Sequence, residues 1–139
     1  MRYLVDTNVV SELMKKDPHE GVVAWLEGHA ANLYLCAVTI EEMRFGALML
    51  PKGKRRTKLE ETIDQIVTAY GSRTFSFDAR AAELCAQYHV KAVSCGRTPT
   101  IEDLMIGGIC AAQNAVLVTR NVKDFDYMDI EVLNPFEVE

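Results

Sequence analysis

Four acidic side chains in this chain of 139 residues stand where short apolar segments end or where helices are expected to begin. They are Asp6, Glu42, Asp103 and Asp124. Carboxylates that converge on one site repel one another unless a cation neutralises them. Oxygen ligands without a neighbouring His or Cys select Mg²⁺ or Mn²⁺ rather than zinc. Magnesium held by a few carboxylates keeps open water positions, which suits phosphoryl chemistry.

Each acid also has an ordinary structural explanation. Thr39-x-x-Glu42 and Thr100-x-x-Asp103 both have the spacing of a capping box, in which the acid bonds back to the start of its helix. Asp6 could cap the first helix, and Asp124 could be an exposed turn residue. A single acid therefore indicates little, and only a shared location for all four would distinguish a site from a set of caps.

Polar residues next to these acids fit the same two interpretations. Thr7, Asn8, Thr119 and Asn121 could hold the carboxylates or a metal-bound water by hydrogen bonds. They could equally form local turn and cap bonds, and both roles stay open from the sequence.

The elements that must position these residues are short apolar strands that alternate with helical patterns. Strands are expected at 3–5, 33–38, 74–77, 115–118 and 130–133, and helices at 7–14, 22–28, 54–70, 78–93, 100–112 and from Thr39 onward. Thr7 is the expected cap of the first helix. This alternation predicts an α/β fold with a parallel sheet covered on both faces. Ligands of such sheets bind at the carboxyl ends of the strands, where all four acids would then lie.

Length and composition predict one globular domain, residues 1–139, with 49% hydrophobic and 25% charged residues. No apolar run approaches the roughly 20 residues of a membrane helix, and an acid follows the first strand too early for a signal peptide. We therefore expect a cytoplasmic protein without membrane association. The net charge of −5 argues against a nucleic-acid partner, but residues 44–58 contain six basic residues and no acid. That stretch could hold phosphates or be a solvated helix start.

Four stretches of the chain resemble the PIN-domain family, and more closely its VapC and FitB-like toxins of type II toxin–antitoxin modules. They are Val5-Asp6-Thr7-Asn8-x-x-Ser11-Glu12, Thr39-Ile40-Glu41-Glu42-Met43-Arg44-x-Gly46, Asp103-Leu104-Met105-Ile106-Gly107-Gly108, and Val118-Thr119-Arg120-Asn121-x-x-Asp124-Phe125. The resemblance covers nearly the whole chain, down to Asn134-Pro135-Phe136. One departure is the pair Gly107-Gly108, where the family usually has two alanines, and this should alter helix packing.

The resemblance implies a PIN-like three-layer sandwich with a short, mainly parallel sheet of about five strands flanked by helices. It implies a Mg²⁺- or Mn²⁺-dependent endoribonuclease that leaves 5′-phosphate and 3′-hydroxyl ends. Asp6, Glu42, Asp103 and Asp124 match the family's catalytic acids, with Asp6, Asp103 and Asp124 as the metal ligands. Glu42 is preferred over Glu41, and Asp103 over Glu102, because of the residues that follow them. Basic candidates for the RNA backbone are Arg44, Lys52, Lys54, Arg55, Arg56, Arg80 and Arg97.

The resemblance also implies partners: a cognate antitoxin, an RNA substrate and a second copy of the chain in a homodimer, within a larger toxin–antitoxin assembly. DNA would be reached only through the antitoxin. The helices at Glu42–Leu50 and Lys54–Tyr70 carry more large apolar residues than one sheet face needs, which favours an interface, although these residues could also belong to the core. They are Met43, Phe45, Leu48, Met49 and Leu50.

Other functions remain as alternatives of different strength. The chain could mainly bind an antitoxin as a co-repressor with little nuclease activity, although binding alone would not need four mutually repelling acids. A phosphatase or receiver domain would need D-x-D at the first strand, or a paired acid with a later Lys, and neither is present. A dinucleotide-binding role lacks G-x-G-x-x-G after the first strand.

Overall fold

A five-stranded, wholly parallel sheet forms the middle layer of the computed structural model, which describes residues 1–138. Its strand order is β3-β2-β1-β4-β5. The strands are β1 Tyr3–Val5, β2 Leu33–Cys36, β3 Thr74–Phe75, β4 Val116–Val118 and β5 Glu131–Leu133. The expected three-layer α/β architecture with a short parallel sheet is confirmed.

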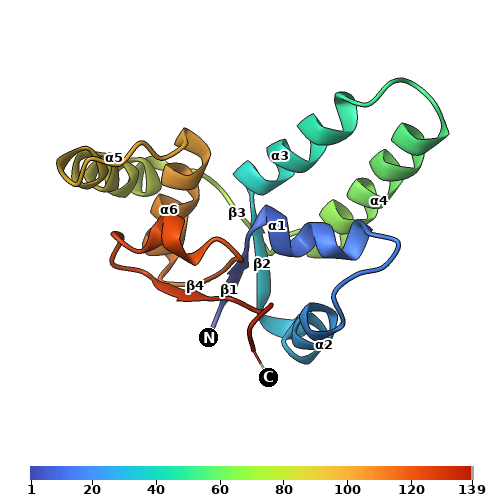
Figure 1. Ribbon diagram of the computed structural model, residues 1–139, viewed down its shortest axis with the longest axis horizontal. Helices are drawn as coiled ribbons and strands as arrows, with labels where there is room; N and C mark the ends of the chain where they lie inside the picture. Colours follow the sequence, from blue (N-terminus) through green and yellow to red (C-terminus); the bar gives the residue numbers. More distant parts are fainter. Residues whose placement is uncertain (139) are drawn as a thin grey trace.

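Helices cover both faces of the sheet (Figure 1). Their bounds are α1 Thr7–Val10, η1 Ser11–Met14, α2 Glu20–Gly28, η2 Ala30–Asn32, α3 Ala37–Leu48, α4 Lys54–Tyr70, α5 Ala79–Ser94, α6 Ile101–Gln113 and η3 Val122–Phe125, where η denotes a 3₁₀ turn. α5 and α6 lie on one side, and α1 to α4 lie on the other. No helix among residues 1–138 is both long and apolar enough to cross a membrane.

The central strands are apolar at every position because both of their faces are covered. Successive side chains of a strand point to opposite faces, so Leu4 packs with the α5–α6 layer while Val5 packs with the α1–α4 layer. Both side chains are fully buried. The same alternation places Leu117 with the first layer and Val118 with the second.

Two helix starts differ from the sequence-based predictions. The second strand ends at Cys36 rather than at residue 38, and α3 begins at Ala37. Thr39 therefore lies inside the first turn, fully buried, with its hydroxyl 3.6 Å from Cys36 Sγ, so the predicted Thr39–Glu42 capping box is wrong. The cap of α1 is Asp6, which accepts a hydrogen bond from the Thr7 amide, and not Thr7 itself.

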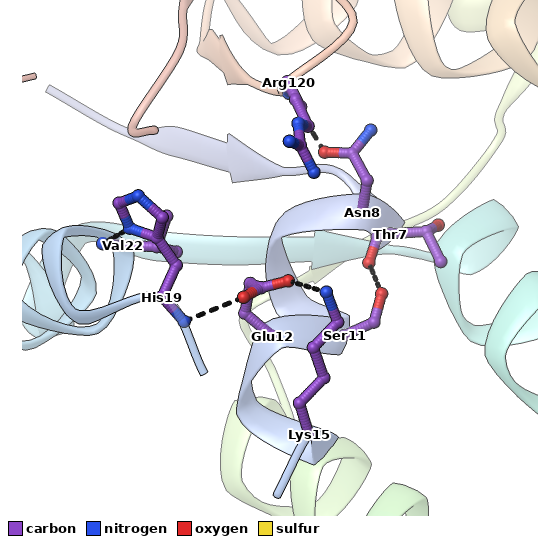
Figure 2. A network of polar contacts seen from close by, with 8 residues as sticks. All are labelled: Thr7, Asn8, Ser11, Glu12, Lys15, His19, Val22 and Arg120. Atoms are coloured by element: carbon purple, nitrogen blue, oxygen red, sulfur yellow. Dashed lines mark hydrogen bonds and ion pairs between the residues drawn. The ribbon is translucent and has the colours of Figure 1, made fainter. Parts of the chain in front are cut away.

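The first helix changes into a 3₁₀ turn after Val10. In this turn an acidic residue is buried and the apolar residue after it is exposed. With three residues per turn, Glu12 points inward and is 4% exposed, while the apolar Leu13 is 43% exposed. Glu12 accepts a hydrogen bond of 2.9 Å from the His19 amide and pairs with Lys15 Nζ at 2.5 Å (Figure 2). The His19 ring in turn accepts from the Val22 amide at the start of α2. These contacts fix α2 against the end of the first helix.

Gly107 and Gly108 allow close packing around α6. A Cβ added at Gly108 would lie 2.5 Å from the carbonyl oxygen of Ala81 on α5 and 3.0 Å from the Cβ of Cys85. At Gly107 it would lie 2.2 Å from Met128 Sδ. The glycine pair therefore tightens the packing of α6 against its neighbours.

Candidate active site

Asp6 lies at the end of β1 and is 5% exposed. Its Oδ1 accepts a hydrogen bond of 2.8 Å from the Thr7 amide. Its Oδ2 accepts from Thr119 Oγ1 at 2.8 Å and from Asn8 Nδ2 at 3.2 Å. Burial raises the pKa of the Asp6 carboxyl, the three donors lower it, and the charge of Asp124 raises it further. The carboxylate is thus held in one orientation at the carboxyl edge of the sheet.

Asn8 and Thr119 link the ends of the adjacent strands β1 and β4. Asn8 Nδ2 donates to Thr119 Oγ1 at 3.1 Å as well as to Asp6. Its Oδ1 accepts from the Arg120 amide at 3.0 Å (Figure 2). Thr119 is fully buried. Asn121 contributes its backbone amide, which donates to Thr119 Oγ1 at 3.1 Å. All four polar residues expected beside the acids therefore act on the Asp6 carboxylate, Thr7, Asn8 and Thr119 directly and Asn121 through Thr119.

Glu42 lies half-buried on α3, and its Oε1 accepts a hydrogen bond of 2.7 Å from the hydroxyl of Thr7. Its neighbour Glu41 is exposed. Burial raises the pKa of Glu42, the Thr7 hydroxyl lowers it, and the charges of Asp6, Glu102 and Glu41 raise it. Thr7 thereby connects two of the predicted acids, since its amide bonds to Asp6 and its hydroxyl to Glu42.

Asp103 and Asp124 line one cavity of about 250 Å³, together with residues 96–99 and Tyr127. Asp103 lies in the first turn of α6, where its amide donates to the capping hydroxyl of Thr100 at 3.2 Å. Burial, and then the charges of Asp6 and Asp124, raise the pKa of Asp103 to about 6. Asp124 is exposed on η3.

The four predicted acids thus act on one another electrostatically at one edge of the sheet. Among residues 1–138, however, no three carboxylate, imidazole or thiol side chains lie close enough together to ligate a single metal ion as a set. The donor chemistry nevertheless fits a hard cation, because the groups are all carboxylates and their mutual repulsion would be relieved by positive charge. Asp6, Asp103 and Asp124 are the residues of this chain that could hold such an ion.

The predicted basic residues are distributed over four places. Lys52, Lys54, Arg55 and Arg56 lie in or near the connection between α3 and α4, at the end of this hairpin that is farthest from the sheet (Figure 1). Arg44, on α3, pairs with Asp64 at 2.6 Å. Arg80 lines a cavity with Val116 and Glu131, the first residues of β4 and β5, and therefore lies at the opposite edge of the sheet. Of these residues, only Arg97 lines the same cavity as Asp103 and Asp124.

Two residues at this edge lie outside the predicted site: Glu102, which was passed over in favour of its neighbour Asp103, and Tyr127, which the sequence did not single out. Glu102 lines a second cavity with Thr7, Glu41, Glu42 and Phe45. Tyr127 is 8% exposed, and its hydroxyl is the only buried side-chain polar atom without a hydrogen-bond partner among the residues described. Nothing in the sequence around Tyr127 distinguishes it, because its position depends on how distant segments meet.

Comparisons with known proteins agree with this architecture. A family model described as "PIN domain" matches residues 3–131. The VapC ribonuclease Y4jK of Sinorhizobium fredii is 32% identical over 136 residues, which cover 96% of this chain and 97% of that protein. Toxin FitB of Neisseria gonorrhoeae is 33% identical over 135 residues, which cover 96% and 97%. The solved structure of FitAB bound to an IR36 DNA fragment superposes with a TM-score of 0.91 and 34% identity, covering 99% of this chain and 97% of that one. The chain therefore belongs to the PIN-domain family.

Proposed function

We propose that this protein is a Mg²⁺- or Mn²⁺-dependent endoribonuclease that acts as the toxin of a type II toxin–antitoxin pair. The observation that carries the proposal is the cluster of Asp6, Glu42, Asp103 and Asp124, whose charges act on one another at the carboxyl edge of the sheet. Isolated caps would not need to share one edge. The similarity to a relative named as a VapC ribonuclease supports the same chemistry.

In this proposal Asp6, Asp103 and Asp124 hold the cation, and Glu42 lies beside them. When bound, the ion supplies a Lewis acid and a water of lowered pKa. Thr119, Asn8 and the Thr7 amide stabilise the ionised form of Asp6 and fix its direction. The Thr7 hydroxyl fixes Glu42, which can accept a proton from an attacking water. Attack of the water at phosphorus forms a new P–O bond and breaks the P–O3′ bond. The water's proton passes to Glu42, and the leaving 3′ oxygen takes up a proton from solvent, so that a 5′-phosphate and a 3′-hydroxyl result.

The RNA backbone would be held by basic side chains that the sequence places in one stretch. Lys52, Lys54 and Arg55 are exposed at the end of the α3–α4 hairpin, and none of them has an ion-pair partner among the residues described. Free cations of this kind bind phosphates without reading sequence. The arrangement therefore supports contact with RNA at a distance from the acids, with Arg44, Arg56, Arg80 and Arg97 as further candidates.

The partners proposed are an antitoxin and a second copy of the chain. A FitAB complex bound to DNA is among the similar structures, and in this proposal the present protein also reaches DNA only through its antitoxin. An RNA substrate and a DNA-bound partner are consistent with activity in the cytoplasm. Phe45, Leu48 and Met49 on or just after α3 are 59%, 49% and 69% exposed, which supports an interface there. A dimer mass in light scattering at micromolar concentration tests the homodimer, and a monomer would contradict it.

The test of the activity is RNA cleavage by antitoxin-free protein with Mg²⁺ or Mn²⁺, with chelator, and with the variant Asp6→Asn. The amide keeps the shape of the side chain but removes its charge. We expect chelation to abolish cleavage and Asp6→Asn to reduce it by more than about 100-fold, beyond the usual effect of losing an outer partner of a metal site. Asp17→Asn is the matched control, because Asp17 is an exposed acid that lines neither cavity at this edge of the sheet. It should cleave like wild type.

The alternative function, an antitoxin-binding co-repressor with little nuclease activity, gives the opposite result. Wild type and Asp6→Asn would then both bind antitoxin, and neither would cleave RNA above the level of a metal-free control. Equal cleavage by wild type and Asp6→Asn would also contradict the proposed mechanism.

A further inference from the structure

Arg97 connects the two chain segments that carry Asp103 and Asp124. Its Nη1 donates to the carbonyl oxygen of Lys123 at 2.9 Å, and its Nη2 pairs with Asp126 Oδ1 at 2.5 Å. The guanidinium also lies over the ring of Tyr127, with Cζ 5.0 Å from the ring centroid. We refer to Arg97 and these three partners as the Arg97 clamp.

All three partners flank Asp124 in the sequence. Lys123 precedes it, and Asp126 and Tyr127 follow it, so the clamp holds the 3₁₀ turn η3 from both sides of the acid. Within residues 1–138, no other side chain donates a hydrogen bond to the backbone of residues 122–126. The side chain of Asp124 has no hydrogen-bond partner of its own among these residues and is exposed. Its position therefore depends on how η3 is held.

The other end of the clamp is anchored firmly. The Arg97 amide donates to the Ala92 carbonyl at 2.8 Å, and the Gly96 amide donates to Val93 at 3.0 Å, with Gly96 at φ +72°. This is the hydrogen-bond pattern of a Schellman motif that ends α5. Three residues later Thr100 caps α6, the helix that carries Asp103. The loop 96–99 is thus fixed at both ends and leads directly into one of the two acids.

We propose that Arg97 is a positioning residue that sets the place of Asp124 relative to Asp103 across their shared cavity. Resting on the function proposed above, the clamp prepares the two carboxylates to hold one cation. Arginine suits this role because its planar guanidinium can donate in two directions and stack on an aromatic ring at once. A lysine could satisfy only some of these contacts.

The clamp is partly exposed, with the Arg97 and Asp126 side chains 38% and 49% accessible. Ion pairs of this kind contribute little to global stability. Variants of the clamp should therefore fold, and their effect should appear locally at η3 and in the properties of the acid site. Arg97 was also a candidate contact for the RNA backbone, and that alternative predicts a different pattern.

The experiment compares wild type with Arg97→Gln, Arg97→Lys and Asp126→Asn, and uses Lys16→Gln as a control that removes an exposed positive charge elsewhere. Four quantities are measured: amide hydrogen exchange of residues 122–126 in metal-free protein, the Kd for Mn²⁺ by calorimetry, and both kcat and KM for RNA cleavage. Positioning predicts that Arg97→Gln accelerates local exchange, weakens Mn²⁺ binding by about 10-fold, and lowers kcat more than it raises KM.

Asp126→Asn separates the two roles because they predict opposite effects. If Arg97 positions η3, loss of its partner carboxylate shifts all four quantities in the same direction as Arg97→Gln, and Arg97→Lys falls between wild type and Arg97→Gln. If Arg97 binds RNA phosphate, Asp126→Asn frees the guanidinium and lowers KM, while Arg97→Gln raises KM at unchanged Mn²⁺ affinity. The second pattern would overturn the proposal.

The exchange measurement requires neither metal nor RNA, so it tests the clamp separately from the proposed function. Unchanged exchange in Arg97→Gln and Asp126→Asn would overturn the positioning role even if wild type cleaves RNA. Altered exchange in a protein that binds Mn²⁺ but cleaves no RNA would keep the clamp and reject the nuclease.

Discussion

The hydroxyl of Thr119 donates a hydrogen bond of 2.8 Å to Oδ2 of Asp6, although the two residues are 113 positions apart in the chain. The contact follows from strand register. β1 and β4 are parallel neighbours in which Val5 pairs with Val118. The next residue of each strand, Asp6 and Thr119, therefore emerges at the same edge of the sheet. The register of the sheet therefore places the Thr119 hydroxyl beside the buried Asp6 carboxylate.

Replacing Thr119 tests this contact. Thr119→Val keeps the shape but removes the donor, so we expect the free energy of unfolding at neutral pH to fall by about 1.5–3 kcal/mol. The Thr119 hydrogen bond lowers the pKa of Asp6, so the loss should shrink as the pH falls through the folded-state pKa and Asp6 becomes protonated. Urea unfolding at several pH values measures this. Thr119→Ser, which keeps the hydroxyl, is the control, and a Ser variant as unstable as the Val variant would contradict the explanation.

Asp103 should make the stability of the metal-free protein depend on pH. Its pKa is raised from 3.8 to about 6 in the folded protein, so the folded state binds a proton more readily than the unfolded chain between these values. The free energy of unfolding should therefore rise as the pH falls from 7 toward 4. Asp103→Asn removes the contribution of Asp103 to this dependence and should be more stable than wild type at pH 7.5, by on the order of 1–2 kcal/mol, with no difference near pH 4.

Two further results bear on the same variant. An acid at a helix N-terminus contributes about 0.3–1 kcal/mol, so a carboxylate that acts only as a cap predicts that Asp103→Asn is the less stable protein at pH 7.5. Mn²⁺ provides the second measurement. A hundredfold excess of cation over its Kd stabilises the folded state by about 2.7 kcal/mol, and the resulting increase in Tm should be smaller in Asp103→Asn than in wild type.

The glycine pair of α6 predicts a graded series of alanine variants. Gly108→Ala brings a methyl group against the backbone carbonyl of Ala81, so α5 must move, and we expect a loss of about 1–3 kcal/mol. At Gly107 the nearest atoms belong to the flexible end of Met128, so the cost should be smaller. Gly46 lies on α3 with nothing within 4 Å of the added carbon, and Gly46→Ala should stabilise the protein by up to about 1 kcal/mol. Equal effects at the three positions, measured by urea unfolding, would contradict the packing argument.

Removing the hydroxyl of Tyr127 should not destabilise the protein. Its buried hydroxyl has no partner among residues 1–138, so Tyr127→Phe should leave the stability unchanged or raise it by about 1 kcal/mol. The ring, and hence its contact with Arg97, is retained. Tyr88 is the matched control, because its hydroxyl donates to Asp129 at 2.5 Å, and Tyr88→Phe should cost about 1.5–3 kcal/mol. Thermal unfolding of the two variants checks both expectations, and a destabilised Tyr127→Phe would show that the hydroxyl has a role.

Local patterns in the sequence determined the class of fold and the location of the acids. Continuous apolar strands and helical periodicity depend on neighbouring residues, as does the cap of α5, where the Asp78 side chain accepts a hydrogen bond of 2.9 Å from the Ala81 amide. The helix over 54–70 was therefore predicted to its last residue and α5 to within one. Asp6 follows a strand because Tyr3–Val5 is apolar and residue 6 is not. Once the strands are parallel, chain direction alone assigns these acids to one edge of the sheet.

Contacts between distant segments were decided only by the tertiary structure. The sequence offered Thr39 as a helix cap, but packing buries it in the core. The sequence did not indicate that Glu42 bonds to Thr7, 35 positions away, or that Arg97 contacts residues in and just after η3. A hydrogen bond or an ion pair needs its two groups within about 3 Å of each other. That separation is set by strand register and helix packing, which depend on side chains throughout the chain rather than on the spacing of the two residues in it.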